Sequence, residues 1–395
     1  MKVVAILEDD AASGGGFNQA LNAIVQMRDL CAGRYEFEVM TTRKSNVEVL
    51  RTLGLKAETF AFSLADKLLS YLSPIPWWHP FQVRLKVRGP FEKMLLRRGC
   101  DLVYFVNPTA RPNVLQHLNF ITTVWDLCHR DTPEFPEVRE SAVFRAREHL
   151  YWTTLPQAIA VVTDSTDLGA AISRRYGIDP GRLLSMPFAP APFLAATAST
   201  ERSTVLRGYG LEEGYFFYPA QLWAHKNHIR ILQALLILRS SGQRLRVVFS
   251  GGDKGNGSYL EKFIGDNALE DQVRLLGFVP SEEMRGLYEG CRAVVMPTYF
   301  GPTNIPPLEA WLIGKPLIYS SQFREQAGNA ALYVDPDDAD ALARAMHTCL
   351  DGETSGALVS AGTTRLQQIE QRRKDAEAAL LARLRQFEAK RSCWA

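Results

Sequence analysis

PAQLWAHKNH at 219–228 and FGPTNIPPLEAWLIGKP at 300–316 are the two stretches that decide the fold. In each, a strand-like apolar run leads through a short turn into a segment with helical spacing. Lys226 stands at the start of the first predicted helix, and Glu309 lies inside the second. A helix N-terminus attracts anions through its free N–H groups and its dipole. Two such termini at successive strand ends therefore suit a ligand that contains a diphosphate.

Strand-like and helical patterns alternate along the whole chain, which predicts an α/β fold with doubly wound parallel sheets. In the first half, the expected strands are 3–7, 37–41, 102–106, 121–125 and 158–162, with helices after the glycine run and at 139–151 and 167–176. In the second half, the expected strands are 215–219, 245–250, 273–276, 293–296, 317–319 and 331–334, with helices at 227–240, 258–267, 281–288, 306–313 and 339–350. These sets predict two similar sandwiches that face a central cleft.

The length of the chain sets the number of domains. At about 150 residues per domain, 395 residues predict two domains. The stretch 187–210 is rich in Pro, Ala, Ser and Thr, as expected of a connection between them. We therefore expect a first domain at 1–200, a second at 201–365 and a C-terminal helix at 366–395.

Charge, cysteines and hydropathy exclude several classes of protein. A net charge of +2 argues against a nucleic-acid binder, which needs a concentrated basic face. The six cysteines are scattered without a CxxC pair, which indicates reduced thiols. The apolar run at the N-terminus is shorter than that of a signal peptide, and no run reaches the 18 or so residues of a membrane span. We expect a cytoplasmic protein.

Both motifs resemble those of the retaining nucleotide-sugar glycosyltransferases of family 4 (glycosyl transferases group 1), which have the GT-B fold. The resemblance implies that Lys226 grips the donor diphosphate and that Glu309 holds the two ribose hydroxyls, which a carboxylate accepts together. Spacing alone leaves plainer readings open, a solvated lysine and a glutamate favoured only by the helix dipole. The resemblance also makes 1–200 the acceptor domain and 201–365 the nucleotide-sugar domain. The terminal helix then either crosses back to the first domain or lies solvated on the second.

Three positions depart from the family pattern. Gln221 stands where many relatives have an Arg, Gly301 replaces the first of two glutamates, and Trp125 replaces a His. The resemblance implies that the N–H groups that follow Gly301 point toward the sugar and the β-phosphate. Those N–H groups belong to Thr303, Asn304 and Ile305. The Thr303 and Asn304 side chains are candidates to supply neutral hydrogen bonds in place of the lost carboxylate.

Further donor contacts are expected from loops at strand ends. Gly15 and Gly16 lie in a glycine run that permits close backbone approach to a phosphate, and the run fits neither GxGxxG nor a Walker A motif. By resemblance, Phe278 and Val279 border the base. Asn227 completes the predicted donor set beside Lys226.

Asp126 and His129 are the expected acceptor residues. Asp126 follows a predicted strand and faces the cleft, which suits orientation of the acceptor or acceptance of its proton. His129 is a candidate to replace the missing imidazole, although a histidine in a loop commonly has a plainer explanation. The catalytic set expected from this reasoning is Asp126, Lys226 and Asn304.

The implied reaction retains configuration and needs neither a cofactor nor a metal, since no DxD motif stands in a suitable context. A hexose moves from a nucleotide-diphosphate sugar to a glycan or lipid-linked acceptor in surface polysaccharide synthesis, such as that of lipopolysaccharide. GDP-mannose is the preferred donor, and UDP- and dTDP-sugars stay open. A binding protein without catalysis is the alternative, and a GT-B epimerase or phosphorylase is a third reading.

One local segment suggests contact with a membrane surface. The residues from 75 to 99 combine Trp77, Trp78 and Phe81 with six Lys and Arg side chains. Aromatic residues beside a basic face suit peripheral attachment at the inner membrane face. The alternative is an ordinary helix with buried aromatics and a solvated charged face.

Overall fold

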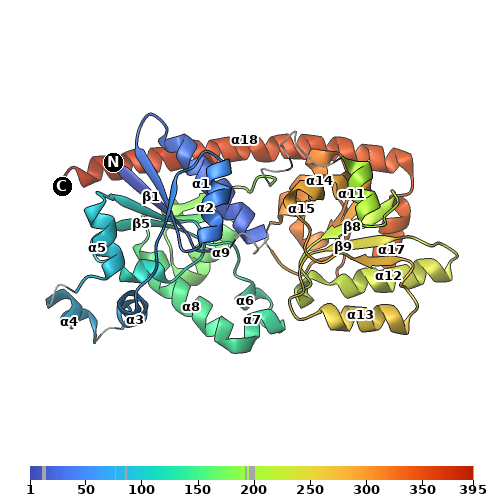
Figure 1. The fold of residues 1–395 in the computed structure, drawn as a ribbon, viewed down its shortest axis with the longest axis horizontal. Helices are drawn as coiled ribbons and strands as arrows, with labels where there is room; N and C mark the ends of the chain where they lie inside the picture. The colour runs from blue at the N-terminus through green and yellow to red at the C-terminus, as the bar shows by residue number, and fades with distance from the viewer. Residues whose placement is uncertain are drawn as a thin grey trace. The chain divides into compact units, whose positions relative to one another are not determined.

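The computed structural model describes residues 1–10, 15–75, 77–84, 87–191, 194, 201–301 and 303–394. It forms two compact units (Figure 1). The first unit comprises Met1–His129, Ser141–Pro187 and Arg372–Ala395. The second comprises Arg130–Glu140 and Phe188–Gln371. The chain therefore passes between the units more than once.

The first unit contains a parallel sheet of seven strands in the order β3-β2-β1-β4-β5-β6-β7. The strands are β1 (Lys2–Leu7), β2 (Glu36–Thr41), β3 (Ala57–Thr59), β4 (Leu102–Phe105), β5 (Asn119–Thr123), β6 (Ala160–Thr163) and β7 (Leu183–Ser185). The five predicted strands are confirmed to within two residues. The edge strands β3 and β7 were not predicted, because three residues are too few to show a pattern.

Helices cover both faces of this sheet, as a doubly wound fold requires. The helices in this part of the chain are α1 (Gly15–Cys31), α2 (Lys44–Thr52), α3 (Leu64–Leu72), α4 (His79–Arg84), α5 (Pro90–Arg97), α6 (Cys128–Asp131), α8 (Val143–Thr154) and α9 (Thr166–Tyr176). Alternate residues of β1 enter two cores, with Val3 packing in the core lined by α1 and Val4 in the core lined by α5, α8 and α9. The predicted helix at 139–151 begins instead at Val143, because Ala142 has a left-handed backbone with φ of 60°.

The second unit contains a parallel sheet of six strands in the order β10-β9-β8-β11-β12-β13. The strands are β8 (Tyr215–Pro219), β9 (Val247–Ser250), β10 (Val273–Leu275), β11 (Cys291–Met296), β12 (Leu317–Ser320) and β13 (Leu332–Val334). The helices are α7 (Pro136–Arg139), α11 (Arg202–Gly208), α12 (His228–Ser240), α13 (Gly257–Asp266), α14 (Ser281–Gly290), α15 (Ile305–Ile313), α16 (Arg324–Ala327) and α17 (Ala339–Thr348). All six predicted strands are confirmed to within two residues.

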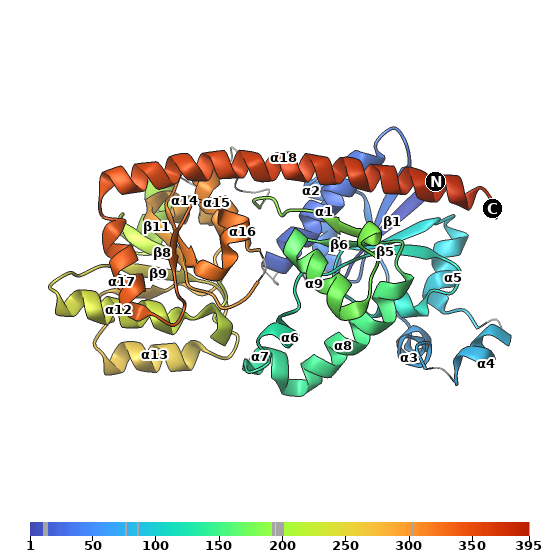
Figure 2. The ribbon, with the colours of Figure 1, turned by 180° about the vertical axis from the view of Figure 1, so that it is seen from behind.

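The last helix, α18 (Gly352–Arg391), runs without a break for 40 residues (Figure 2). Its first part packs in the second unit, where Leu358 and Ile369 are buried in the core. Its last part packs in the first unit, where Leu380, Leu384 and Phe387 are buried against α1 and the sheet. The helix thus supplies apolar side chains to both cores. No helix in the described part of the chain is both long and apolar enough to cross a membrane.

Candidate active site

The two motifs meet in the second unit at the carboxyl ends of β8 and β11, which are neighbours in the sheet. Lys226 ends a short 3₁₀ helix before α12, and Asn304 is the N-cap residue of α15. The Nζ atom of Lys226 donates to Oδ1 of Asn304 at 3.3 Å. Ligands of open α/β sheets bind outside the carboxyl ends of the strands. This contact therefore lies where a donor diphosphate would be expected.

Gly301 has a structural reason to be glycine. Its φ of 109° is a conformation that residues with side chains rarely adopt. A Cβ atom at this position would come within 2.9 Å of Oδ1 of Asn304. The Asn304 amide also donates to the carbonyl of Gly301 at 3.2 Å. At the position where the family pattern has a glutamate, this chain therefore has a tight turn that holds the Asn304 side chain. Pro302 lies outside the described residues.

The backbone of Asn304 is held by a glutamine that the sequence did not single out. Its N–H donates to Oε1 of Gln326 at 3.0 Å, and Nε2 of Gln326 donates to its carbonyl at 2.6 Å. The hydroxyl of Tyr319 donates to Oε1 of Gln326 at 2.8 Å and accepts from Nδ2 of Asn304 at 2.7 Å. The expectation that this N–H points toward the donor is thereby corrected for Asn304. Thr303 is half-buried beside it, and Ile305 is buried at the start of α15.

Glu309 lies in the second turn of α15 and is buried. Burial raises its pKa to about 7, against hydrogen bonds from Tyr288 and from the backbone of Ala191. The hydroxyl of Tyr288 donates to Oε2 of Glu309 at 2.5 Å. The carboxyl group is therefore close to its titration point at neutral pH.

The other predicted donor residues of the second unit differ in their exposure. Asn227 is buried, and its side-chain amide donates to the carbonyls of Pro297 at 3.0 Å and Pro336 at 2.8 Å. It fastens the start of α12 to two strand ends. Val279 is buried, whereas Phe278 is 66% exposed. Phe278 is thus the side chain of this pair that a ligand can reach.

Asp126 follows β5 in the first unit and is held by a cation. Its carboxylate forms an ion pair with Arg147 and accepts from the N–H of Cys128 at 3.0 Å. Burial by itself would raise the pKa of Asp126, but the Arg147 charge and the Cys128 hydrogen bond outweigh it and lower the pKa. The carboxylate is therefore ionised and fixed in orientation.

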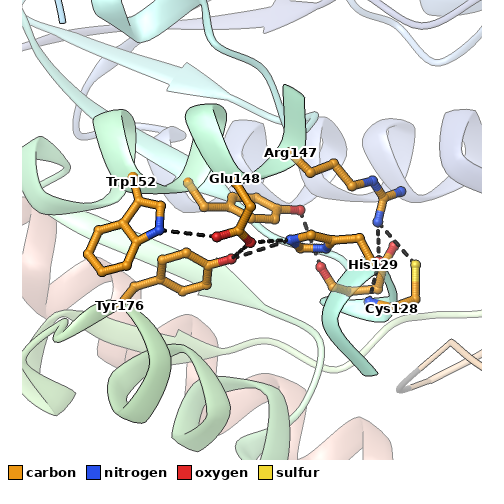
Figure 3. A network of polar contacts seen from close by, with 8 residues as sticks. Cys128, His129, Arg147, Glu148, Trp152 and Tyr176 are labelled. Carbon is orange, nitrogen blue, oxygen red and sulfur yellow. Dashed lines mark hydrogen bonds and ion pairs between the residues drawn. The ribbon is translucent and has the colours of Figure 1, made fainter. Parts of the chain in front are cut away.

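His129 lies in the core of the first unit, with its ring fully buried. Its Nε2 atom is 2.7 Å from Oε1 of Glu148, which also accepts from the hydroxyl of Tyr176 at 2.8 Å (Figure 3). The indole of Trp152 donates to the other carboxylate oxygen at 3.1 Å. Burial lowers the pKa of His129 despite the nearby carboxylate. The structure thus places this histidine in a packed network and leaves it no exposed edge for an acceptor.

Gly16, in the first turn of α1, lies against Trp125. A Cβ atom on Gly16 would come within 3.0 Å of the Trp125 ring and 3.6 Å of Oδ2 of Asp9. A side chain at this position would require the Trp125 ring to shift by a few tenths of an ångström. Gly15 is exposed with open space around it, and Gly14 lies outside the described residues.

Asp9 is a carboxylate that the sequence reasoning passed over. It follows β1, and its Oδ2 atom accepts from Nδ2 of Asn107 at 2.5 Å. Burial raises its pKa. Within the described part of the chain it has no ion-pair partner, whereas the neighbouring Glu8 is 3.4 Å from Arg111. Only its position at the end of the first strand could have drawn attention to it.

Among the described residues, no group of three or more His, Cys, Asp and Glu side chains is placed to hold a metal ion. All six cysteines are free thiols, five of them buried and Cys393 exposed.

Residues 208–374 match the family described as glycosyl transferases group 1. The matched region makes up less than half of the chain. The match contains Lys226, the Gly301 turn and Glu309, so it rests on the part of the chain that forms the second unit.

Two curated relatives extend the likeness. O-antigen chain mannosyltransferase B of Escherichia coli is 28% identical over 252 residues, covering 62% of this chain and 65% of that protein. The O-antigen chain mannosyltransferase RfbU of Salmonella typhimurium is 31% identical over 129 residues, covering 32% of this chain and 36% of that protein. The matched stretches span less than two thirds of each of these relatives.

A solved structure shares the whole fold. HepE of Anabaena, in a crystal structure with UDP and glucose, aligns with a TM-score of 0.71 at 16% identity over 96% of this chain and 99% of that one. The GT-B fold expected from the sequence is thereby confirmed.

Proposed function

We propose that the protein is a retaining glycosyltransferase that needs no metal ion and moves a hexose, with mannose from GDP-mannose preferred, to a glycan or lipid-linked oligosaccharide. The observation that carries this proposal is the contact between Lys226 and Asn304 at the carboxyl ends of β8 and β11. It brings an ammonium group to the N-terminus of α15, a nine-residue helix. Together they supply positive potential for a leaving diphosphate.

The reaction forms one bond at the anomeric carbon and breaks another there. The acceptor hydroxyl attacks from the face that the diphosphate leaves, and the bond between the anomeric carbon and the phosphate oxygen breaks. The acceptor proton passes to the leaving phosphate oxygen. Lys226 offsets the charge that develops on that phosphate. Because the leaving group takes the proton, the absence of a glutamate at Gly301 does not remove a required base.

Two carboxylates are candidates to orient the acceptor. Asp126 is ionised but engaged by Arg147. Asp9 and Trp125 both lie close to Gly16, and the Asp9 carboxylate carries no ion pair among the described residues and accepts a hydrogen bond from Asn107. A carboxylate beside an aromatic ring suits the hydroxyls and the apolar face of a sugar. We assign acceptor orientation to Asp9 and a supporting role to Asp126.

The choice of mannose rests on the two relatives, both of which are named as O-antigen chain mannosyltransferases. HepE binds UDP in its crystal structure, so UDP-sugars stay in the comparison. Thermal unfolding with GDP, UDP and dTDP tests the base, because a ligand raises the melting temperature by mass action. GDP should give the largest shift. Transfer from GDP-mannose to synthetic lipid-linked oligosaccharides tests the activity, and absence of turnover with every donor would overturn the proposal.

A binding protein without catalysis is the second candidate. It is favoured by Gln221, Gly301 and Trp125, which stand at positions where the family that the chain resembles usually has charged or reactive residues. Nucleotide affinity combined with no hydrolysis and no transfer from any of the three classes of donor would establish it.

We also propose attachment to anionic membranes through the first unit. Helix α3 exposes Leu64, Leu68 and Tyr71 at a spacing that places them on one face, with exposed fractions of 83%, 59% and 70%. Trp77 and Phe81, which follow in the chain, are also exposed. Basic side chains lie near them in sequence, with Lys67 and Arg84 exposed and Arg88 half-buried. Apolar and basic groups together suit a bilayer that carries negative charge.

Part of the basic segment is excluded from this surface. Arg98 pairs with Glu38 and Glu58, so its charge is already used. Glu92 is buried and accepts from three backbone N–H groups at 116–118. Flotation with anionic liposomes tests the proposal. The double substitution Leu68→Ser and Tyr71→Ser should abolish binding, and a wild-type protein that stays unbound at low salt would contradict it.

A further inference from the structure

An eleven-residue segment, Arg130–Glu140, belongs to the second unit although the chain before and after it lies in the first. It contains Phe135 and α7 (Pro136–Arg139). Neither the motifs nor the proposed reaction assigns it a role. Two of its side chains contact the loops that carry the candidate diphosphate site.

Glu137 makes the first of these contacts. Its side chain is 7% exposed, and its Oε1 atom accepts from the backbone N–H of His225 at 2.9 Å. The same oxygen is hydrogen-bonded to Nδ1 of the His225 ring. Burial by itself raises the pKa of Glu137, but the two bonds from His225 outweigh it and hold the pKa below its usual value. A buried carboxylate with both partners on one residue fixes that residue firmly.

Phe135 makes the second contact, by packing on the loop that follows β11. Its ring centroid lies 5.2 Å from that of Tyr299 and 5.5 Å from that of Phe300. The Phe300 ring stacks on His225 with centroids 3.7 Å apart and planes at 14°. Phe135, Phe300 and His225 therefore form one aromatic cluster.

His225 joins the two loops of the site. Its carbonyl accepts from the N–H of Tyr299 at 2.9 Å and from the hydroxyl of Thr298 at 3.3 Å. Lys226 is the next residue after His225, and the Gly301 turn follows Phe300. His225 therefore contacts the loop that leads to the Gly301 turn and lies next to Lys226 in the other loop.

We propose that Glu137 is a positioning residue for the donor diphosphate, acting through His225 on Lys226 and on the Gly301 turn. This inference rests on the proposed function and adds a residue from a distant part of the chain to its donor site. Removal of the carboxylate takes away the hydrogen bonds that the backbone N–H and the ring nitrogen of His225 make with Glu137. The loops then lose the arrangement in which Lys226 meets Asn304.

The segment also links the two candidate sites along the chain. Asp126 and His129 lie in the first unit, and Glu137 lies in the second eight residues after His129.

The experiment compares three substitutions in the full-length protein: Glu137→Ala, Glu137→Gln and Glu134→Ala. Glu134 is exposed in the same segment and serves as the matched control. Calorimetry with GDP, UDP and dTDP measures nucleotide affinity, and steady-state kinetics separates the KM of the donor from the KM of the acceptor. Hydrogen exchange at 223–226 and 298–301 reports the loops without any ligand.

Glu137→Ala should weaken nucleotide binding about tenfold and raise the donor KM by a similar factor, because a hydrogen bond to a charged group is lost. Its acceptor KM should stay unchanged, and exchange should rise at both loops. Glu137→Gln should recover part of the affinity, since its amide oxygen still accepts from His225, and Glu134→Ala should match the wild type.

Two outcomes distinguish failure of the positioning role from failure of the proposed function. If Glu137→Ala binds nucleotide like the wild type, the positioning role is overturned whatever happens to exchange, and the proposed function stands. If the wild type binds none of the three nucleotides, the proposed function fails and the positioning role fails with it.

Discussion

The hydroxyl of Tyr288 donates to Oε2 of Glu309 at 2.5 Å, so a residue near the end of α14 determines the state of the carboxyl group proposed to hold the ribose. Burial of that carboxyl group would favour its neutral form, and the tyrosine counters this in part. The balance puts the pKa of Glu309 at about 7.

Nucleotide affinity should therefore rise with pH. If the ionised carboxylate binds the ribose hydroxyls, affinity increases up to about tenfold between pH 6 and pH 8, as Glu309 loses its proton. Calorimetry across this range measures the slope. Glu309→Gln should remove the part of the slope that belongs to this residue and leave the titration of the nucleotide. Equal slopes in both proteins would refute the ribose role.

The same group should affect folding in the opposite direction. The pKa of Glu309 rises from 4.5 unfolded to about 7 folded, so the native state binds the proton more tightly. Its contribution to the free energy of unfolding is fully present below pH 4.5 and falls by roughly 3 kcal/mol as pH rises to about 7. Urea unfolding at pH 5 and pH 8 measures this, with Glu309→Gln showing a smaller difference.

Lys226→Ala should reduce kcat/KM for the donor about 10- to 100-fold, because one charge-assisted contact to phosphate is lost. Lys262→Ala is the control, because Lys262 is exposed and pairs only with Asp266 in the described structure. A fall in kcat/KM of less than threefold for Lys226→Ala would argue against the diphosphate role.

Replacement of Gly301 by glutamate, the residue expected from the family pattern, should not raise activity. The positive φ and the contact of a Cβ atom with Asn304 are expected to cost about 1–3 kcal/mol in stability. Gly301→Ala isolates this cost from the added charge, and Gly356→Ala in α18, where the space is open, is the comparison. Urea unfolding and donor turnover are the measurements. An active and stable Gly301→Glu protein would show that the turn adapts.

Substitutions at Asp9 and Asp126 should change different properties of the protein, acceptor binding for Asp9 and stability for Asp126. Asp126→Asn leaves Arg147 without its carboxylate partner and should lower the free energy of unfolding by about 1–3 kcal/mol. Asp9→Asn keeps an oxygen for Asn107 and should leave stability almost unchanged while raising the acceptor KM. The reverse pattern, a stable Asp126→Asn protein with weak acceptor binding, would return the acceptor role to Asp126.

Local sequence patterns were sufficient to predict the fold, because each predicted strand is a short apolar run with clear ends. Tyr215–Pro219 is one example, predicted and observed with the same ends. The approach of Lys226 to Asn304 was also predictable from the sequence, since both follow strands that end at one edge of a sheet. The side chains that contact the site residues were not predictable from the sequence. Tyr288 beside Glu309 and Arg147 beside Asp126 come from separate helices, and nothing near them in sequence marks the pairing.

The contact between Glu137 and His225 was not predictable from the sequence for a further reason. The Glu137 carboxylate and His225 are 88 residues apart, and the segment that carries it looks like a connection within the first unit. Its contacts with the second unit are those of Glu137 with His225 and of Phe135 with the loop after β11. Long-range pairs of this kind require coordinates.

The division of α18 between the two cores has a practical consequence for dissecting the protein. A chain cut after Gln371 would lack Leu380, Leu384 and Phe387, leaving an uncovered apolar trough along α1 that invites self-association. The second unit expressed as 188–371 would lack Glu137 and Phe135. Neither half is therefore obtained by a single cut, and a study of one lobe needs a rejoined chain that carries its distant pieces.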